Sequence, residues 1–254
     1  MIGLFDSGIG GLTVVRELLR HAPTASFVYL GDTARTPYGN KSADTVTRYS
    51  IENAKFLLDR GATSIVIACN SASAVATEAL RKEYPNVPIF EVIAPAVEDA
   101  LAVTKGRIGV IGTRATILSG AYERRLKERR GIDVTSIPCP MFVPLVEEGW
   151  LEDAETKRIG RRYLSPLRQA GVDTLILGCT HYPLLTPIIQ RYMGGRVNLI
   201  DSGASVVKRL GDLLSDRHER GHQSFYLTDV SRRSEEIAAS WLGRPITFEP
   251  VTLG

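Results

Sequence analysis

The chain has 254 residues, of which 44% are hydrophobic and 23% are charged. This length accommodates one large or two modest domains, and the charged fraction is ordinary for a globular protein. The net charge of +3 comes without a basic arm or an acidic tail, so no nucleic-acid partner is expected. No apolar run approaches the ~18 residues of a membrane helix, and no signal sequence precedes the first strand. We therefore expect a cytoplasmic protein with no membrane partner.

The hydrophobic pattern predicts strands that alternate with helices along the chain. A loop is expected at 138–144, a turn at Pro95, and an extended piece near 246–248. The predicted strands are 2–6, 26–30, 64–69, 87–93, 107–111, 133–137, 174–179, 197–200 and 225–227. The predicted helices are 12–20, 44–60, 72–83, 96–104, one from after Thr116 to about Arg130, 152–170, 186–192, one from about 202 to 214, and 234–241.

This alternation indicates an α/β protein with parallel sheets, in which right-handed crossovers bring the carboxyl ends of the strands to one edge. The order of elements in the first half resembles that in the second. We therefore expect two similar doubly wound domains that face each other across a central cleft. The first domain is predicted to comprise residues 1–93 and about 210–254, and the second residues 94–209.

Two of these strands end in cysteines, Cys69 and Cys179, and each cysteine is followed by small polar residues. A single cysteine at such a place is most often inert packing, but two at equivalent positions of a repeat indicate chemistry. If the domains face each other, one thiolate can remove a proton from a ligand while the other thiol donates one to the opposite face. The pattern therefore predicts inversion of a stereocentre. Cys139, between two prolines, is expected to be structural.

Other chemistries fit these residues less well. A zinc site needs clustered ligands, and only Cys179 and His181 are close in sequence. A Cys/His hydrolase leaves the second cysteine unexplained. The glycine-rich turn at 8–11 misses the full dinucleotide spacing, because Thr13 holds its last position. No lysine ends an apolar strand, as a pyridoxal site requires. We therefore expect neither a metal nor a cofactor.

The polar residues at the strand ends suit a small zwitterion. Asp6 can hold an ammonium group or orient a base, and backbone N–H groups at helix starts suit carboxylates. Alternatively, some of these side chains serve only as helix N-caps. The hydroxyl and amide groups in question belong to Ser7, Asn70, Ser71, Thr113, Thr116 and Thr180.

Four segments, at 6–12, 31–39, 68–73 and 177–184, together closely resemble bacterial glutamate racemases of the aspartate/glutamate racemase superfamily. The resemblance extends in the same order and spacing from residue 2 to about residue 203. It implies a cofactor-independent isomerase that interconverts L- and D-glutamate and supplies D-glutamate for peptidoglycan. It also implies a homodimer, although no surface feature of the sequence selects a dimer face.

The resemblance assigns roles to individual residues. Cys69 is the base implied for D-glutamate and Cys179 the base for L-glutamate, with Asp6 and His181 as helpers. Either Glu147 or Glu148 is a further polar helper. The implied substrate-binding residues are Asp6, Ser7, Tyr38, Gly39, Asn70, Ser71, Thr180 and His181, with Thr113 and Thr116 nearby. Ser71 departs from the threonine usual in the family, and it keeps the hydroxyl while losing a methyl group.

Two rival functions stay open. An aspartate or hydantoin racemase of the same superfamily is the nearest, although the loop at Pro37-Tyr38-Gly39 and the length of the match favour glutamate. The other is a non-catalytic amino-acid-binding or regulatory protein on the same scaffold. The presence of both cysteines together with Asp6 and His181 argues against that second alternative.

Overall fold

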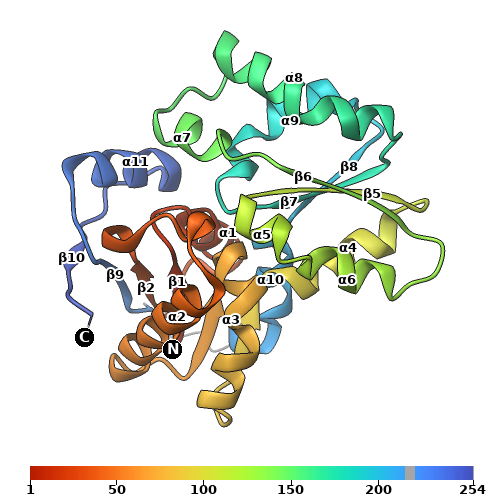
Figure 1. Cartoon of the computed structure of the whole chain (residues 1–254). Coiled ribbons are helices and arrows are strands. Elements are labelled where there is room, and N and C mark those ends of the chain that lie inside the picture. Colours follow the sequence, from red (N-terminus) through yellow and green to blue (C-terminus); the bar gives the residue numbers. More distant parts are fainter. Residues whose placement is uncertain (215–220, 254) are drawn as a thin grey trace.

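The computed structural model describes residues 1–214 and 221–253 and contains two parallel β-sheets with helices packed on both faces of each (Figure 1). The first sheet has the strand order β10-β9-β2-β1-β3-β4 and the second β6-β5-β7-β8. The strands are β1 (Ile2–Asp6), β2 (Phe27–Gly31), β3 (Ser64–Ile67), β4 (Ile89–Glu91), β5 (Arg107–Gly112), β6 (Asp133–Pro138), β7 (Thr174–Gly178), β8 (Asn198–Asp201), β9 (Gln223–Leu227) and β10 (Glu249–Pro250).

Helices connect these strands, and short 3-10 turns supplement them. The 3-10 turns are η1 (Thr33–Arg35), η2 (Tyr38–Asn40), η3 (Tyr182–Leu185) and η4 (Gly211–Leu214). The α-helices are α1 (Leu12–His21), α2 (Ala43–Asp59), α3 (Asn70–Glu83), α4 (Ile93–Val103), α5 (Arg114–Leu118), α6 (Ala121–Lys127), α7 (Phe142–Glu147), α8 (Ala154–Gln169), α9 (Thr186–Met193), α10 (Ser202–Arg209) and α11 (Arg232–Leu242).

The two sheets repeat one arrangement of strands. In the first sheet β1 lies between β2 and β3, with β4 beyond β3, and in the second β5 lies between β6 and β7, with β8 beyond β7. Every pairing is parallel, so the carboxyl ends of each sheet share one edge. Cys69 follows β3 and Cys179 follows β7, which are equivalent strands. The predicted pair of similar parallel-sheet domains is confirmed.

Alternating side chains of the central strands supply the cores on both faces of each sheet. In β3, Ile65 and Ile67 pack on the face covered by α2 and α3, whereas Val66 packs on the opposite face. In β7, Ile176 packs toward α4 and α6, whereas Leu175 and Leu177 face the other way. Each of these six side chains is at most 1% exposed. The strand ends that carry the cysteines therefore rest on rigid, fully buried supports.

The C-terminal segment extends the first sheet, because β9 pairs with β2 and β10 pairs with β9. The strand membership of both sheets is compatible with the predicted division into residues 1–93 plus about 210–254 and residues 94–209. The limits of the two domains themselves remain a prediction. Every helix among the described residues is too short or too polar to cross a bilayer.

Several predicted limits near the sheet edge are wrong. Strand β3 ends at Ile67, and α3 begins at Asn70 rather than Ala72, because Cys69 itself occupies the N-cap in an extended conformation. Pro95 lies in the first turn of α4 instead of a turn before it. Proline is tolerated there because its missing N–H would have no partner within the helix.

Other predicted limits change farther along the chain. The single helix expected to reach Arg130 is divided at Gly120, whose φ of +66° ends α5 and begins α6. The loop expected at 138–144 becomes helical from Phe142. The helix expected to reach 214 ends at Arg209 and is followed by η4, and the last extended piece lies at 249–250 rather than 246–248.

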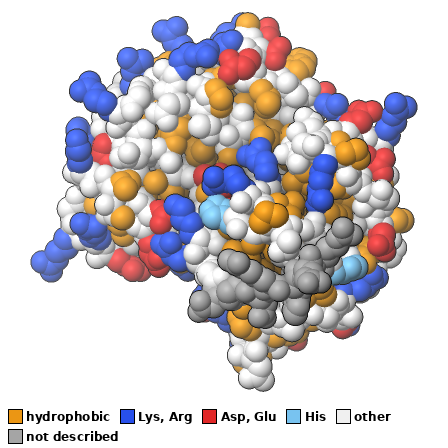
Figure 2. All heavy atoms as spheres, turned by 180° about the vertical axis from the view of Figure 1, so that it is seen from behind, with side chains coloured by type: hydrophobic (Ala, Val, Ile, Leu, Met, Phe, Trp, Pro, Cys, Tyr) orange, Lys and Arg blue, Asp and Glu red, His pale blue; other side chains and the backbone are white. Residues whose placement is uncertain are grey.

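Charged side chains are dispersed over the rear face of the molecule. Figure 2 shows lysine and arginine side chains mainly around its upper and left edges, with acidic and apolar side chains among them. One basic residue of α8, Lys157, lies 3.6 Å from the Glu152 carboxylate. This is the arrangement expected of solvated helix faces.

Candidate active site

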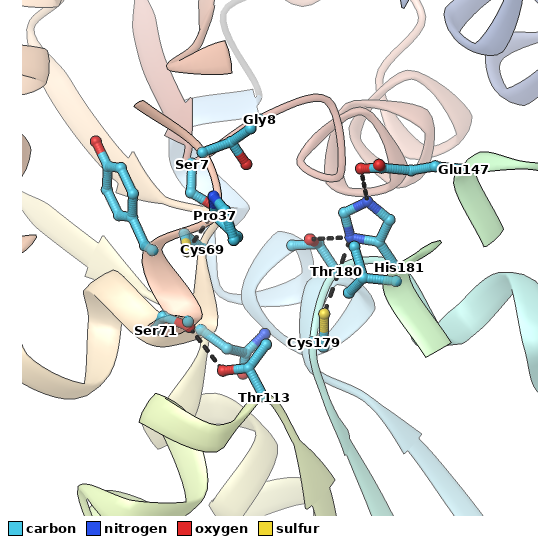
Figure 3. A pocket seen from close by; sticks show the side chains of 15 residues that line it. Ser7, Gly8, Pro37, Cys69, Ser71, Thr113, Glu147, Cys179, Thr180 and His181 are labelled. Carbon is cyan, nitrogen blue, oxygen red and sulfur yellow. Dashed lines mark hydrogen bonds and ion pairs between the residues drawn. The ribbon is translucent and has the colours of Figure 1, made fainter. Parts of the chain in front are cut away.

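A cavity of about 40 Å³ lies between the carboxyl ends of the two sheets. Cys69 and Cys179 line it from opposite sides (Figure 3). The structure thus brings together two thiols that are 110 positions apart in the sequence. The remaining residues that line the cavity are Ser7, Gly8, Thr36, Pro37, Tyr38, Gly39, Asn70, Ser71, Thr113, Val143, Glu147, Thr180 and His181.

Cys69 stands where β3 gives way to α3, and its side chain is 4% exposed. Its Sγ lies 3.5 Å from Ser7 Oγ. Burial raises the pKa of this thiol to about 12, and the nearby Asp6 carboxylate adds to the rise, while the Ser7 hydroxyl and the backbone N–H groups of Ala72 and Ser7 oppose it. Cys69 is therefore a protonated thiol at neutral pH, suited to donate a proton.

Asp6 is 1% exposed and does not line the cavity. Its Oδ2 accepts a hydrogen bond of 3.0 Å from the Gly8 N–H, and Oδ1 has no hydrogen-bond partner among the described residues. Burial raises the pKa of Asp6, whereas the charge of His181 lowers it. Of the two roles predicted for Asp6, its buried position favours orienting a base over holding an ammonium group.

Cys179 belongs to a chain of three polar groups (Figure 3). Its Sγ lies 3.9 Å from His181 Nδ1, and His181 Nε2 lies 3.0 Å from Glu147 Oε1. Burial lowers the pKa of His181, but its hydrogen bonds with Cys179 and Glu147 raise it more, to about 10. Glu148 is 68% exposed and points to Arg233 at 4.0 Å. The structure therefore selects Glu147 from the two glutamates that the sequence left open.

Tyr38 and Gly39 edge the cavity from a loop of the first domain. The Tyr38 hydroxyl donates to Asp32 and accepts from Asn53 at 3.0 Å, so these two bonds fix the position of its ring. A Cβ atom at Gly39 would lie 3.0 Å from that of Thr113, which brings the two domains close at this point. Gly39 is therefore placed to offer backbone rather than side-chain atoms.

Asn70 bridges the domains with its side chain. Its Nδ2 donates to Ser202 Oγ at 3.1 Å, and its Oδ1 accepts from the Tyr122 hydroxyl at 2.6 Å. Both ends of the amide are thus already paired, although Asn70 lines the cavity. A ligand contact from this residue would come from its N–H, which belongs to the first turn of α3.

The hydroxyls of Ser71 and Thr113 lie 2.9 Å apart at the edge of the cavity. Thr116 lies behind them, 3.2 Å from Ser71 and 3.0 Å from Thr113, and does not line the cavity. Thr116 is therefore placed as a support for these two hydroxyls. Thr180 does line the cavity, and its carbonyl accepts a hydrogen bond from Thr13 of α1 at 2.8 Å.

Four lining residues were not among those predicted: Gly8, Thr36, Pro37 and Val143. The first three belong to segments that carry the resemblance, so their motif membership could have indicated them. Val143 is apolar and gives no chemical signal. Within the described part of the chain, no three His, Cys, Asp or Glu side chains gather closely enough to hold a metal ion.

Comparison with known proteins decides the family. Residues 12–210 match the model of the Asp/Glu/Hydantoin racemase family. The chain belongs to this family. Among curated relatives, glutamate racemase from Aquifex aeolicus is 49% identical over 246 residues, covering 96% of this chain and 95% of the relative. Glutamate racemase from Geobacter metallireducens is 46% identical over 250 residues, covering 95% and 92%.

Solved structures of the family agree with this fold. Glutamate racemase from Francisella tularensis in complex with D-glutamate has a TM-score of 0.92 at 36% identity, covering 99% of this chain and 97% of that one. The RacE1 isoform from Bacillus anthracis has a TM-score of 0.94 at 38% identity, with coverage of 100% and 97%. An aspartate racemase homologue from Pyrococcus horikoshii is 20% identical, with a TM-score of 0.62, and shares the fold.

Proposed function

We propose that this protein is a glutamate racemase that interconverts L- and D-glutamate with Cys69 and Cys179 as its two bases. The observation that carries the proposal is the approach of these two thiols to one cavity from equivalent strands of the two sheets. Relatives named glutamate racemase match at 46–49% identity over almost the whole chain. A structural neighbour of similar length binds D-glutamate.

In the direction from L- to D-glutamate, the Cys179 thiolate removes the α-proton and the electron pair of the C–H bond stays on the substrate as a carbanion. The Cys69 thiol then donates its proton to the opposite face of that carbon, and Cys69 becomes a thiolate. The reverse reaction exchanges the two roles. His181 Nδ1, 3.9 Å from Cys179 Sγ, is placed to hold positive charge beside the Cys179 thiolate.

The binding residues follow from their positions around the cavity. The N–H groups at the start of α3 suit the α-carboxylate, because the positive end of a helix dipole stabilises an anion. The hydroxyls of Ser7, Ser71, Thr113 and Thr180 supply hydrogen bonds to the remaining polar groups. Ser71 retains the hydroxyl that this role needs.

The setting of the reaction is also part of the proposal. A mechanism with two thiols requires reduced cysteines, so we place the enzyme in the reducing cytoplasm. There its product, D-glutamate, would enter peptidoglycan synthesis. The homodimer remains a prediction, which light scattering from the purified protein at two concentrations would test.

Incubation with D-glutamate in deuterated water, without added cofactor, tests the proposed function. We expect L-glutamate that carries deuterium at the α-carbon, because the proton donated to the new face comes from a thiol that exchanges with solvent. L-Glutamate without deuterium would contradict the two-thiol mechanism. Binding of D-glutamate without any turnover would favour the amino-acid-binding alternative, and faster turnover of aspartate or a hydantoin would favour those racemases.

The third cysteine supplies a matched control. Cys69→Ala should abolish racemisation, because the D-face base is lost. Cys139→Ala should retain it, because Cys139 does not line the cavity. Racemisation that survives Cys69→Ala at the rate of the wild type would remove Cys69 from the mechanism.

A further inference from the structure

Helix α11 belongs to the first domain but reaches the catalytic groups of the second. It connects β9 and β10, which extend the first sheet, and lies beside α7 of the second domain (Figure 1). A capping box formed by Ser231 and Ser234 fixes its first turn. Its buried residues, Ser234, Ile237, Ala238 and Trp241, form one stripe along the helix. This stripe carries a large aromatic side chain to the domain interface.

Trp241 packs against the ring of His181. The two ring centroids are 5.6 Å apart and the planes meet at 89°, and both side chains are at least nine-tenths buried. The two nitrogens of His181 face Cys179 and Glu147. A Cβ atom at Gly10 of the first domain would collide with His181 Cε1. Gly10 and Trp241 of the first domain thus enclose the imidazole. The two nitrogens of the same ring contact Cys179 and Glu147 of the second domain.

Arg233, on the same helix, contacts the other member of the pair. Its Nη2 donates a hydrogen bond of 2.6 Å to the backbone carbonyl of Glu147 and lies 4.0 Å from the Glu148 carboxylate. This carbonyl ends α7, so the bond fixes the helix end from which the Glu147 side chain extends. One helix therefore contacts both His181 and Glu147.

We propose that Trp241 and Arg233 are positioning residues that hold the Glu147–His181 pair against Cys179. The inference rests on the proposed racemase reaction and adds the C-terminal helix to the apparatus of one of its two bases. Neither residue lines the cavity, so each acts through the groups that it contacts. Misplacement of a catalytic group by about 1 Å costs up to ~100-fold in rate, which sets the scale of the effect.

The two bases make this proposal testable by isotope effects. Enantiomers have equal free energy, so a variant must lower kcat/KM equally in both directions. If only the Cys179 step slows, removal of the α-proton from L-glutamate becomes more rate-limiting. Removal of the α-proton from D-glutamate by Cys69 instead becomes a reversible step that precedes the slow one. The α-deuterium isotope effect should then rise for L-glutamate and fall for D-glutamate. A general loss of folding does not separate the enantiomers in this way.

The variants form matched pairs. Arg233→Ala is compared with Arg232→Ala, since Arg232 is the neighbouring arginine and is 92% exposed. Trp241→Ala and Trp241→Phe are compared with Ile237→Ala, which shortens another buried side chain of the same helix. We expect kcat to fall about tenfold in Arg233→Ala and by about 10- to 100-fold in Trp241→Ala, with KM changed less than about threefold. Trp241→Phe should recover most of the rate because it restores the aromatic contact.

The isotope effects of Arg233→Ala and Trp241→Ala should move in opposite directions for the two enantiomers, while Arg232→Ala and Ile237→Ala leave their ratio unchanged. Equal changes for both enantiomers, or the same asymmetry in the Ile237→Ala control, would overturn the proposal. Arg233 is half-exposed, so its variant provides the test even if Trp241→Ala fails to fold. Wild-type turnover is measured first, and its absence would instead refute the proposed racemase function.

Discussion

His181 contacts two ionisable groups of the site, the Cys179 thiol and the Glu147 carboxylate. It is 7% exposed, yet its pKa is raised to about 10 because its bonds with Cys179 and Glu147 outweigh the cost of burying the charge. An imidazolium buried in this way is stable only while its partners remain. The charge on His181 therefore links its contact with the Cys179 thiol to the stability of the fold.

This coupling predicts how stability depends on pH. The folded pKa of about 10 lies above the ordinary value of 6.5, so protonation of His181 favours the folded state. The contribution is complete below pH 6.5 and is lost as the pH rises toward 10. The free energy of unfolding of the wild type relative to His181→Gln should fall by roughly 1 kcal/mol per pH unit above 6.5.

Denaturant unfolding between pH 6.5 and 7.5 would measure this slope, below the range in which most free thiols and phenols ionise. His21→Gln, at an exposed histidine of α1, is the control and should follow the wild type. A difference between the wild type and His181→Gln that stays constant or widens with pH would contradict the assignment of charge to His181.

The loop between β2 and α2 shows how one element supports another. It carries Thr36, Pro37, Tyr38 and Gly39 to the cavity, but much of its anchorage comes from the segment after β9. Asp32 is 0% exposed and accepts bonds from Arg35, Tyr38 and Thr228. The segment after β9 therefore helps to fix this wall of the cavity.

Thr228→Val should loosen this loop. The hydroxyl donates to Asp32 Oδ1 at 3.0 Å and accepts from the Ala34 N–H at 2.9 Å, and valine keeps the shape while removing both bonds. We expect a loss of about 1–3 kcal/mol in the free energy of unfolding and a rise in KM for glutamate larger than the fall in kcat. Denaturant unfolding and initial-rate kinetics would measure these two effects.

A second threonine provides the comparison. Thr252→Val, at an exposed position near the C-terminus, should alter neither the stability nor KM. Thr228→Val that kept the stability of the wild type would show that the segment after β9 does not anchor the loop.

At the scale of the molecule, the cavity is narrow and the two domains are joined across it. Its volume is about 40 Å³. Asn70, bonded to Ser202 and Tyr122, and Ser71, bonded to Thr113, connect its two sides. These side-chain hydrogen bonds hold the two domains together across the cavity.

A substrate held between two domains stabilises both against unfolding. D-Glutamate at about 100 times its dissociation constant should add about 2.7 kcal/mol, which corresponds to a rise in Tm of several degrees for a protein of this size. A thermal scan with increasing D-glutamate would measure it. D-Leucine at the same concentration, which lacks the second carboxylate, should produce a smaller shift. Equal shifts with both amino acids would contradict a site selective for glutamate.

The amino-acid sequence determined the class of fold and indicated the two cysteines that line the cavity. Apolar β-branched runs that alternate with amphipathic helices specify parallel sheets, because these patterns are local and follow from burial. Cys69 and Cys179 were found because each ends such a run. The limits of α3, α4 and α6 were wrong where capping or a left-handed glycine overrode the periodicity, since those depend on one residue each.

The tertiary structure decided how these residues act together. Sequence spacing gave no reason to choose Glu147 over Glu148, and only packing directs one carboxylate to His181 and the other toward solvent. Asp6 was predicted either to hold an ammonium group or to orient a base, and the fold buries it away from the lining of the cavity. Trp241 lies 60 positions from His181, with no motif around it. Contacts between distant segments depend on how the two sheets pack against each other, and a local sequence pattern does not predict that packing.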